Sequence, residues 1–133
     1  MNVTNWLFVL FFLAFINGII GASGVRRFLS AHPVINSPQD IESFKQMVRV
    51  QMYQALIQTG LLVIVNIIGV YGLITHRTNL LIVLLLNGVI LFMGKSMKGA
   101  EERARSMEVA NAGLAAEYEH ICKTWIEKAL PDF

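Results

Sequence analysis

The chain has 133 residues, of which 55% are hydrophobic and only 15% are charged, whereas about a quarter of the residues are charged in an ordinary soluble domain. A soluble domain of this size would expose large apolar patches with such a composition. The composition therefore excludes a disordered tail and a multi-domain enzyme, and the single cysteine, Cys122, excludes a disulfide scaffold. We expect an all-α integral membrane protein.

The first apolar stretch, residues 6–22, is long enough to cross the hydrocarbon core of a bilayer, which takes roughly 20 helical residues. No Lys or Arg precedes this stretch, so we expect a retained membrane span and not a signal peptide. Small residues recur on one face of this span at Ala14, Gly18 and Ala22, a pattern typical of helices that pack closely in membranes.

The signals for the start of a second helix lie well before the second apolar stretch. Ser37 is a good N-cap, Pro38 suits the first helical position, and Asp40 in the first turn complements the helix dipole. Apolar residues then keep helical spacing into the span. We predict one helix from Pro38 to Ile74 whose first turns stand outside the membrane.

Two further spans, residues 55–74 and 79–94, form a predicted helical hairpin. The first of them carries Gly69 and Gly72 as further candidates for close helix packing. The chain thus divides into a first span (1–24), a connection and helical stalk (25–54), the hairpin (55–95) and a tail (96–133).

The distribution of basic residues predicts how the spans face. The chain has no Lys or Arg before the first span, four between the first and second, one between the second and third, and four at the start of the tail. Lys and Arg concentrate on the cytoplasmic side of membrane proteins. We therefore expect the N-terminus outside and the tail inside, in a bacterial inner membrane.

The tail carries apolar and small residues at alternating steps of three and four, as in a coiled coil. We predict that the third helix continues through the tail and carries this seam of Met97, Ala100, Ala104, Met107, Asn111, Leu114, Tyr118, Ile121 and Trp125.

Two alternatives remain open for the tail. The run 111–113, Asn-Ala-Gly, is also typical of a turn between two shorter helices that fold back on each other. An amphipathic helix on the membrane surface is disfavoured, because its polar face would bring many glutamates to anionic headgroups.

A continuous tail helix is too long to bury its seam against the short stalk. Exposure of the distal seam would forgo on the order of 1.5–3 kcal/mol for each large side chain. We therefore expect association with further copies or with other membrane subunits, with the polar Asn111 fixing the register of the seam.

Each span also carries one asparagine, Asn17, Asn66 or Asn87, and a carboxamide in hydrocarbon is costly without a partner. We expect a layer of hydrogen bonds between helices, with Asn66 facing Asn87 across the hairpin. The alternative is an amide-lined pore in an oligomer, with Thr59 and Gln58 as further lining.

No acidic residue, Lys, Arg or His lies inside the apolar cores, which disfavours a proton pump, and no catalytic, metal-binding, cofactor-binding or nucleic-acid-binding motif is evident. We expect a non-enzymatic membrane protein, surrounded by lipids, that forms a homo-oligomeric scaffold or channel-like assembly. The alternatives are an accessory subunit of a larger respiratory, secretion or motor complex, and a stator-like ion-conducting subunit.

Overall fold

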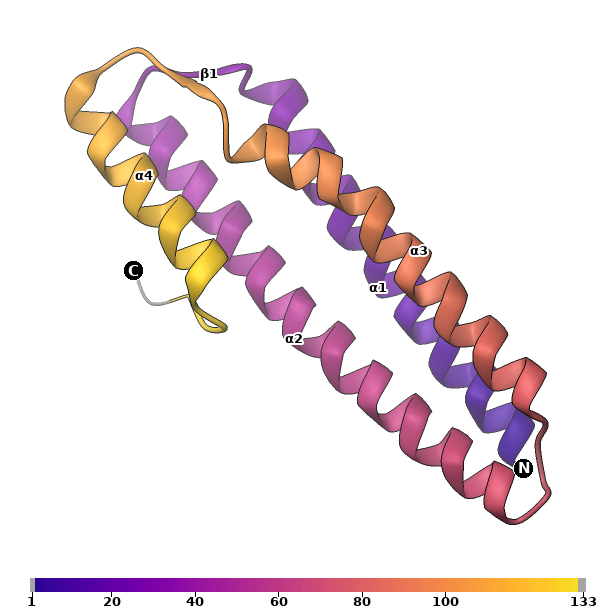
Figure 1. Ribbon diagram of the computed structural model, residues 1–133. Coiled ribbons are helices and arrows are strands. Elements are labelled where there is room, and N and C mark those ends of the chain that lie inside the picture. Colours follow the sequence, from indigo (N-terminus) through magenta and orange to yellow (C-terminus); the bar gives the residue numbers. More distant parts are fainter. Residues whose placement is uncertain (1, 132–133) are drawn as a thin grey trace.

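The computed structural model describes residues 2–131, the side chain of Ser96 excepted. The chain is mostly helical, and its elements in order are α1 (Val3–Ala31), β1 (Val34–Ile35), α2 (Pro38–Ile74), α3 (Leu80–Ala104), β2 (Glu108–Val109) and α4 (Ala112–Glu127) (Figure 1).

The helices α1, α2 and α3 are each long and apolar enough to cross a membrane, as predicted. They lie side by side, and α1 packs against both of the others, whereas α2 and α3 contact each other less (Figure 1). Large apolar side chains cover their outer surface, among them Phe12, Ile67, Leu84, Leu91 and Phe92. A surface of this kind is compatible with an integral membrane location.

The predicted start of α2 is confirmed. The Ser37 side chain accepts a hydrogen bond from the backbone N–H of Asp40, and Pro38 occupies the first turn. The helix then runs without a break to Ile74, because no residue inside it interrupts the backbone ladder.

The predicted continuous tail helix is wrong. Helix α3 ends at Ala104, and α4 runs back along α2 after a connection that includes β2 (Figure 1). Asn111 does not lie on a helical seam, because its side chain caps α4 by accepting a hydrogen bond from the N–H of Gly113.

A short parallel ladder fixes this arrangement. Val34 pairs with Glu108 and Ile35 with Val109, so that the connection between α1 and α2 lies beside the connection between α3 and α4. This pair was not predicted, because two-residue strands carry no recognisable period in the sequence.

The fold buries the distal seam inside its own chain. Phe44 of α2 is fully buried, and its ring lies 4.8 Å from that of Tyr118 and 6.5 Å from that of Trp125, between centroids. Ile121 is also fully buried, and Leu114 packs against the same cluster. The distal seam residues are therefore covered within the described chain. The exposed seam from which we expected association of the tail is not found there.

Two apolar clusters stabilise the two ends of the helical bundle. The α4-end core joins α1, α2, α3 and α4 around Phe28, Phe44 and Ile121. The turn-end core lies near the α2–α3 turn and contains Val3, Leu7, Val65, Val83 and Leu86. Polar side chains occupy the region between these two cores.

Candidate functional site

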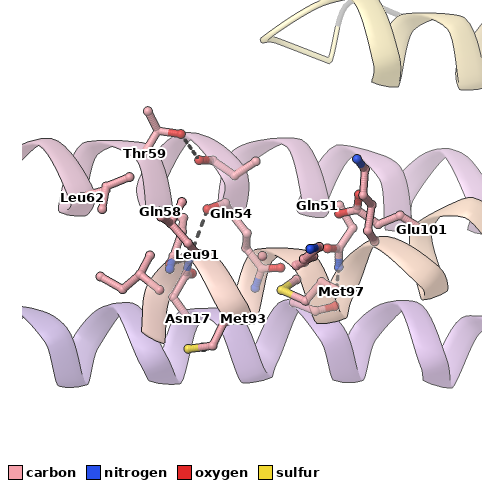
Figure 2. Close-up of a pocket in the computed structure, with 17 residues that line it drawn as sticks. Asn17, Gln51, Gln54, Gln58, Thr59, Leu62, Leu91, Met93, Met97 and Glu101 are labelled. Carbon is pink, nitrogen blue, oxygen red and sulfur yellow. Dashed lines mark hydrogen bonds between the residues drawn. The ribbon is translucent and has the colours of Figure 1, made fainter. Parts of the chain in front are cut away.

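A cavity of about 690 Å³ lies between α1, α2 and α3 in the region between the two cores (Figure 2). We call it the amide pocket, because α2 lines it with the side chains of Gln51, Gln54 and Gln58. These residues follow one another at helical steps of three and four, so they lie on one face of α2. The structure thereby concentrates carboxamides on a single wall.

Hydrogen bonds join this wall to α1. The Asn17 amide donates to the backbone carbonyl of Gln54 at 3.1 Å and to Oε1 of Gln58 at 2.9 Å. One turn further along, the Gln51 amide donates to the carbonyl of Gly21 at 2.8 Å. Figure 2 shows these side chains extending from α1 and α2 toward one another.

The glycines of α1 make room for these groups. A Cβ atom at Gly21 would lie 3.1 Å from Oε1 of Gln54 and 3.3 Å from Cε of Met97. At Gly18 it would lie 2.6 Å from Cε of Met93, too close without a shift of that side chain. Larger residues at either glycine would therefore push into the pocket.

One acceptor of the pocket lacks a donor. Oε1 of Gln54 is buried and receives no hydrogen bond from any group in residues 2–131. A buried acceptor without a partner costs about 1–3 kcal/mol. The pocket is therefore chemically suited to a water or ligand that brings an O–H or N–H group.

The lining changes from apolar to charged along the pocket. Leu62, Ile90 and Leu91 lie at the end near the turn-end core, followed by the carboxamides. Lys95 and Lys98 lie on α3 on either side of Met97, whose Cε approaches the same glycine, Gly21, as Oε1 of Gln51 and Gln54, so the two lysines stand across the pocket from these glutamines. Exposed lining residues on both sides, Leu91 among them at 67%, place the opening between α2 and α3.

A single carboxylate, Glu101, contributes to this lining, and it pairs with Arg105 at 3.8 Å. Neither Lys95 nor Lys98 lies within ion-pair distance of a carboxylate among the described residues. Lys98 is attracted by Glu101 at longer range, so the charged end of the pocket presents two ammonium groups without a direct ion-pair partner among the described residues.

The predicted layer of three asparagines separates into two sites. Nδ2 of Asn66 donates to Oδ1 of Asn87 at 3.0 Å, as expected for the hairpin. Each of these amides also donates to the carbonyl four residues earlier in its helix. Asn17 does not join them and belongs to the amide pocket, as does Thr59, whose hydroxyl donates to the carbonyl of Ala55.

The small residues singled out in the sequence lie mostly at helix contacts. Ala14 is fully buried and Ala22 half-buried. A Cβ at Gly69 would lie 3.2 Å from Cγ1 of Val83, and one at Gly72 would lie 2.7 Å from Cγ1 of Val3.

The predicted seam residues are distributed over several environments. Met97 lines the amide pocket, Ala100, Ala104, Tyr118 and Ile121 are buried in the α4-end core, and Met107, Leu114 and Trp125 pack against it.

The sequence did not predict that Gln51, Gln54 and the two lysines form part of one site. The available signal was the helical spacing of three glutamines at the point where α2 becomes apolar. Its meaning depends on α1 and α3, which the sequence alone does not position. Within the described part of the chain, no group of three or more His, Cys, Asp or Glu residues could hold a metal ion.

Comparison of the chain with protein-family models, curated proteins and solved structures gives no match, so we infer its function from the geometry of the pocket.

Proposed function

We propose that the chain is a non-enzymatic integral membrane protein that binds an amphiphilic molecule in the amide pocket. The observation that carries this proposal is the order of groups along the pocket wall. Aliphatic side chains at one end give way to carboxamides and ammonium groups on facing helices, as the chains of a membrane amphiphile give way to its polar linkage and headgroup. A pocket of about 300–1,000 Å³ with a few convergent polar groups is the usual form of a small-molecule site.

The proposal includes an orientation in the membrane. The distribution of basic residues supports an N-terminus outside and α4 in the cytoplasm of a bacterial cell. In that orientation, Lys95 and Lys98 lie at the inner surface of the inner membrane, where long basic side chains reach the headgroups. The opening between α2 and α3 then faces the inner leaflet, which supplies the amphiphile.

The carboxamides of the lining make a ligand-filled pocket more favourable than an empty one. Carboxamides in an apolar environment are unfavourable unless they are hydrogen-bonded. Gln54 keeps a buried acceptor without a donor, and the described residues provide no acceptor for the side-chain NH2 groups of Gln54 and Gln58. An amphiphile with ester, hydroxyl or amide groups at this depth would satisfy them.

The proposal is tested by filling the pocket from α3. Gly94 lines the pocket, and a Cβ there meets no atom within 4 Å, so Gly94→Phe fits the helix and occupies the cavity. We expect native mass spectrometry of the protein extracted from its membrane to show a retained lipid-like adduct in the wild type and its loss in Gly94→Phe.

The matched control is Gly88→Phe. Gly88 lies on the same helix in equally open space but outside the amide pocket, so the adduct should persist. Equal adduct levels in the wild type and Gly94→Phe would contradict the proposal, as would a wild type that carries no adduct.

A second candidate function is assembly, either as a homo-oligomeric scaffold or as a subunit of a larger complex. It is favoured by Gly60, which is exposed within the apolar part of α2 with open space around it. Such a position allows another helix to approach closely. Mass photometry in mild detergent tests it: Gly60→Leu should shift an oligomer toward the monomer, and a monomeric wild type would oppose self-assembly.

The geometry of a single chain gives less support to a channel or a stator-like subunit. Asn66 and Asn87 bind each other, and the apolar turn-end core lies beyond the pocket. A continuous polar path across the bilayer would therefore require further subunits.

A further inference from the structure

We infer that the occupant of the amide pocket is an anionic phospholipid, with its phosphate between Lys95 and Lys98 and its acyl chains leaving between α2 and α3. This inference rests on the proposed function and names the chemical class of the ligand. It is carried by the charge at one end of the pocket, the donors in the middle and the volume of the cavity.

The charge of the pocket favours an anion. Lys95 and Lys98 are three residues apart and lie on one face of α3, where both line the cavity. Glu101, the carboxylate of the lining, forms its ion pair with Arg105 and attracts Lys98 only at longer range. A zwitterionic headgroup would add a third cation beside the two ammonium groups, whereas an anionic headgroup neutralises them.

The middle of the pocket favours the ester region of a phospholipid. The side-chain NH2 groups of Gln54 and Gln58 have no acceptor in the described protein, and ester carbonyls are acceptors. These glutamines and the two lysines face each other from α2 and α3, with Leu62, Ile90 and Leu91 toward the turn-end core. Ester carbonyls adjoin the phosphate in the same way, with the acyl chains on one side of both.

The size of the pocket requires the acyl chains to leave it. A volume of about 690 Å³ accommodates a headgroup and a glycerol backbone as a small-molecule site does. Two long acyl chains need more room than this. Their path out passes Leu62 and Leu91, which flank the opening with apolar surface.

The test compares two lipids on the full chain. Native mass spectrometry in detergent measures the affinity for dioleoylphosphatidylglycerol, which is anionic, and for dioleoylphosphatidylcholine, which is zwitterionic. We expect the wild type to prefer the anionic lipid. In Lys95→Gln/Lys98→Gln, this affinity should fall by about fivefold for each lysine removed, while the affinity for the zwitterionic lipid, whose choline cation offsets its phosphate, should fall by less.

The matched control is Arg103→Gln/Lys123→Gln, which removes two exposed cations from outside the pocket and should leave both affinities unchanged. Glycerol 3-phosphate serves as the water-soluble competitor and should fail to displace the lipid. Displacement by it at an affinity close to that of the lipid would assign the site to a soluble phosphate and overturn the inference.

The two proposals fail in different ways. If the wild type binds both lipids equally, or the lysine variant keeps the anionic preference, the inference is overturned. The proposed function still stands in that case, provided that Gly94→Phe loses both lipids. If the wild type binds neither lipid, the inference fails, and a native adduct of another kind that Gly94→Phe loses would preserve the proposed function alone.

Discussion

The Tyr118 side chain provides hydrogen-bond partners for backbone groups at the C-terminal end of α3. The last carbonyls of a helix have no partner within the helix. The Tyr118 hydroxyl donates to the carbonyl of Ala104 at 2.6 Å and accepts the N–H of Met107 at 2.9 Å. One side chain of α4 thus satisfies two backbone groups at the point where the chain reverses.

Substitution of Tyr118 by Phe should destabilise the α4 end. The change preserves the ring contact with Phe44 but leaves a backbone acceptor and a backbone donor unpaired, at a cost of about 1–3 kcal/mol. Thermal unfolding of the purified protein should show a lower midpoint. Tyr53→Phe is the control, because Tyr53 is half exposed and should leave the midpoint unchanged. Equal midpoints for Tyr118→Phe and the wild type would show that water replaces the hydroxyl.

Cys122 should make the stability of the α4 end depend on pH in the alkaline range. Burial raises the pKa of the Cys122 thiol, because the thiolate is poorly solvated there. The free energy that the buried, protonated thiol contributes to stability is fully present at a pH below the pKa of this thiol in the unfolded chain. It is lost as the pH rises through the pKa of the thiol in the folded protein. The wild type should therefore lose stability from about pH 8.5 upward, and Cys122→Ala should lose less between pH 8 and 10. Chemical denaturation at several pH values measures the difference.

At the scale of elements, local signals predicted α2 and could not predict the tail. Ser37, Pro38 and the absence of a breaker specify a long helix whatever surrounds it. The steps of three and four in the tail fit both a continuous helix and two helices that lie antiparallel. The β1–β2 ladder and the contacts of Tyr118 decide between them, and their partners lie far away in the sequence.

The return of α4 along α2 predicts a cross-link within one chain. Nζ of Lys45 lies 3.6 Å from Oε1 of Glu117. In a Cys122→Ala background, Lys45→Cys with Glu117→Cys should react with a short bis-maleimide to give a cross-linked monomer. The control pair, Lys45→Cys with Glu119→Cys, places the second thiol at an exposed position elsewhere on α4 and should react less. A covalent dimer as the main product would contradict packing of α4 on α2 of the same chain and would support a helical seam between chains.

The hydrogen bond between Asn66 of α2 and Asn87 of α3 should be measurable as a coupling energy between substitutions at these two positions. Asn66→Leu or Asn87→Leu alone leaves the other amide without its partner and should cost about 1 kcal/mol. The double substitution should cost less than the sum of the two single ones. Unfolding in detergent measures all four proteins, and strict additivity would contradict a shared hydrogen bond.

At the scale of the whole molecule, hydropathy predicted the helical class and the three long apolar helices, since each helix satisfies its own backbone. The pairing of Asn66 with Asn87 was also predictable, because a short turn makes the two helices antiparallel. The amide pocket was not, since it needs Gly21 of α1 opposite Gln54 of α2, with Met97 of α3 beside the same glycine. Such a site depends on how three separate helices diverge, which no local pattern encodes.

With α2 and α3 across a bilayer, as proposed above, the ladder that pairs Val34 with Glu108 and Ile35 with Val109 makes completion of the fold depend on insertion of both helices. In a bilayer, these residues reach the same side only after both intervening helices have crossed. In a chain whose third helix fails to insert, Glu108 stays on the opposite side of the membrane from Val34, so α4 cannot pack against α2. Packing of α4 against α2 would therefore distinguish chains in which both helices have crossed from chains in which the third helix has not.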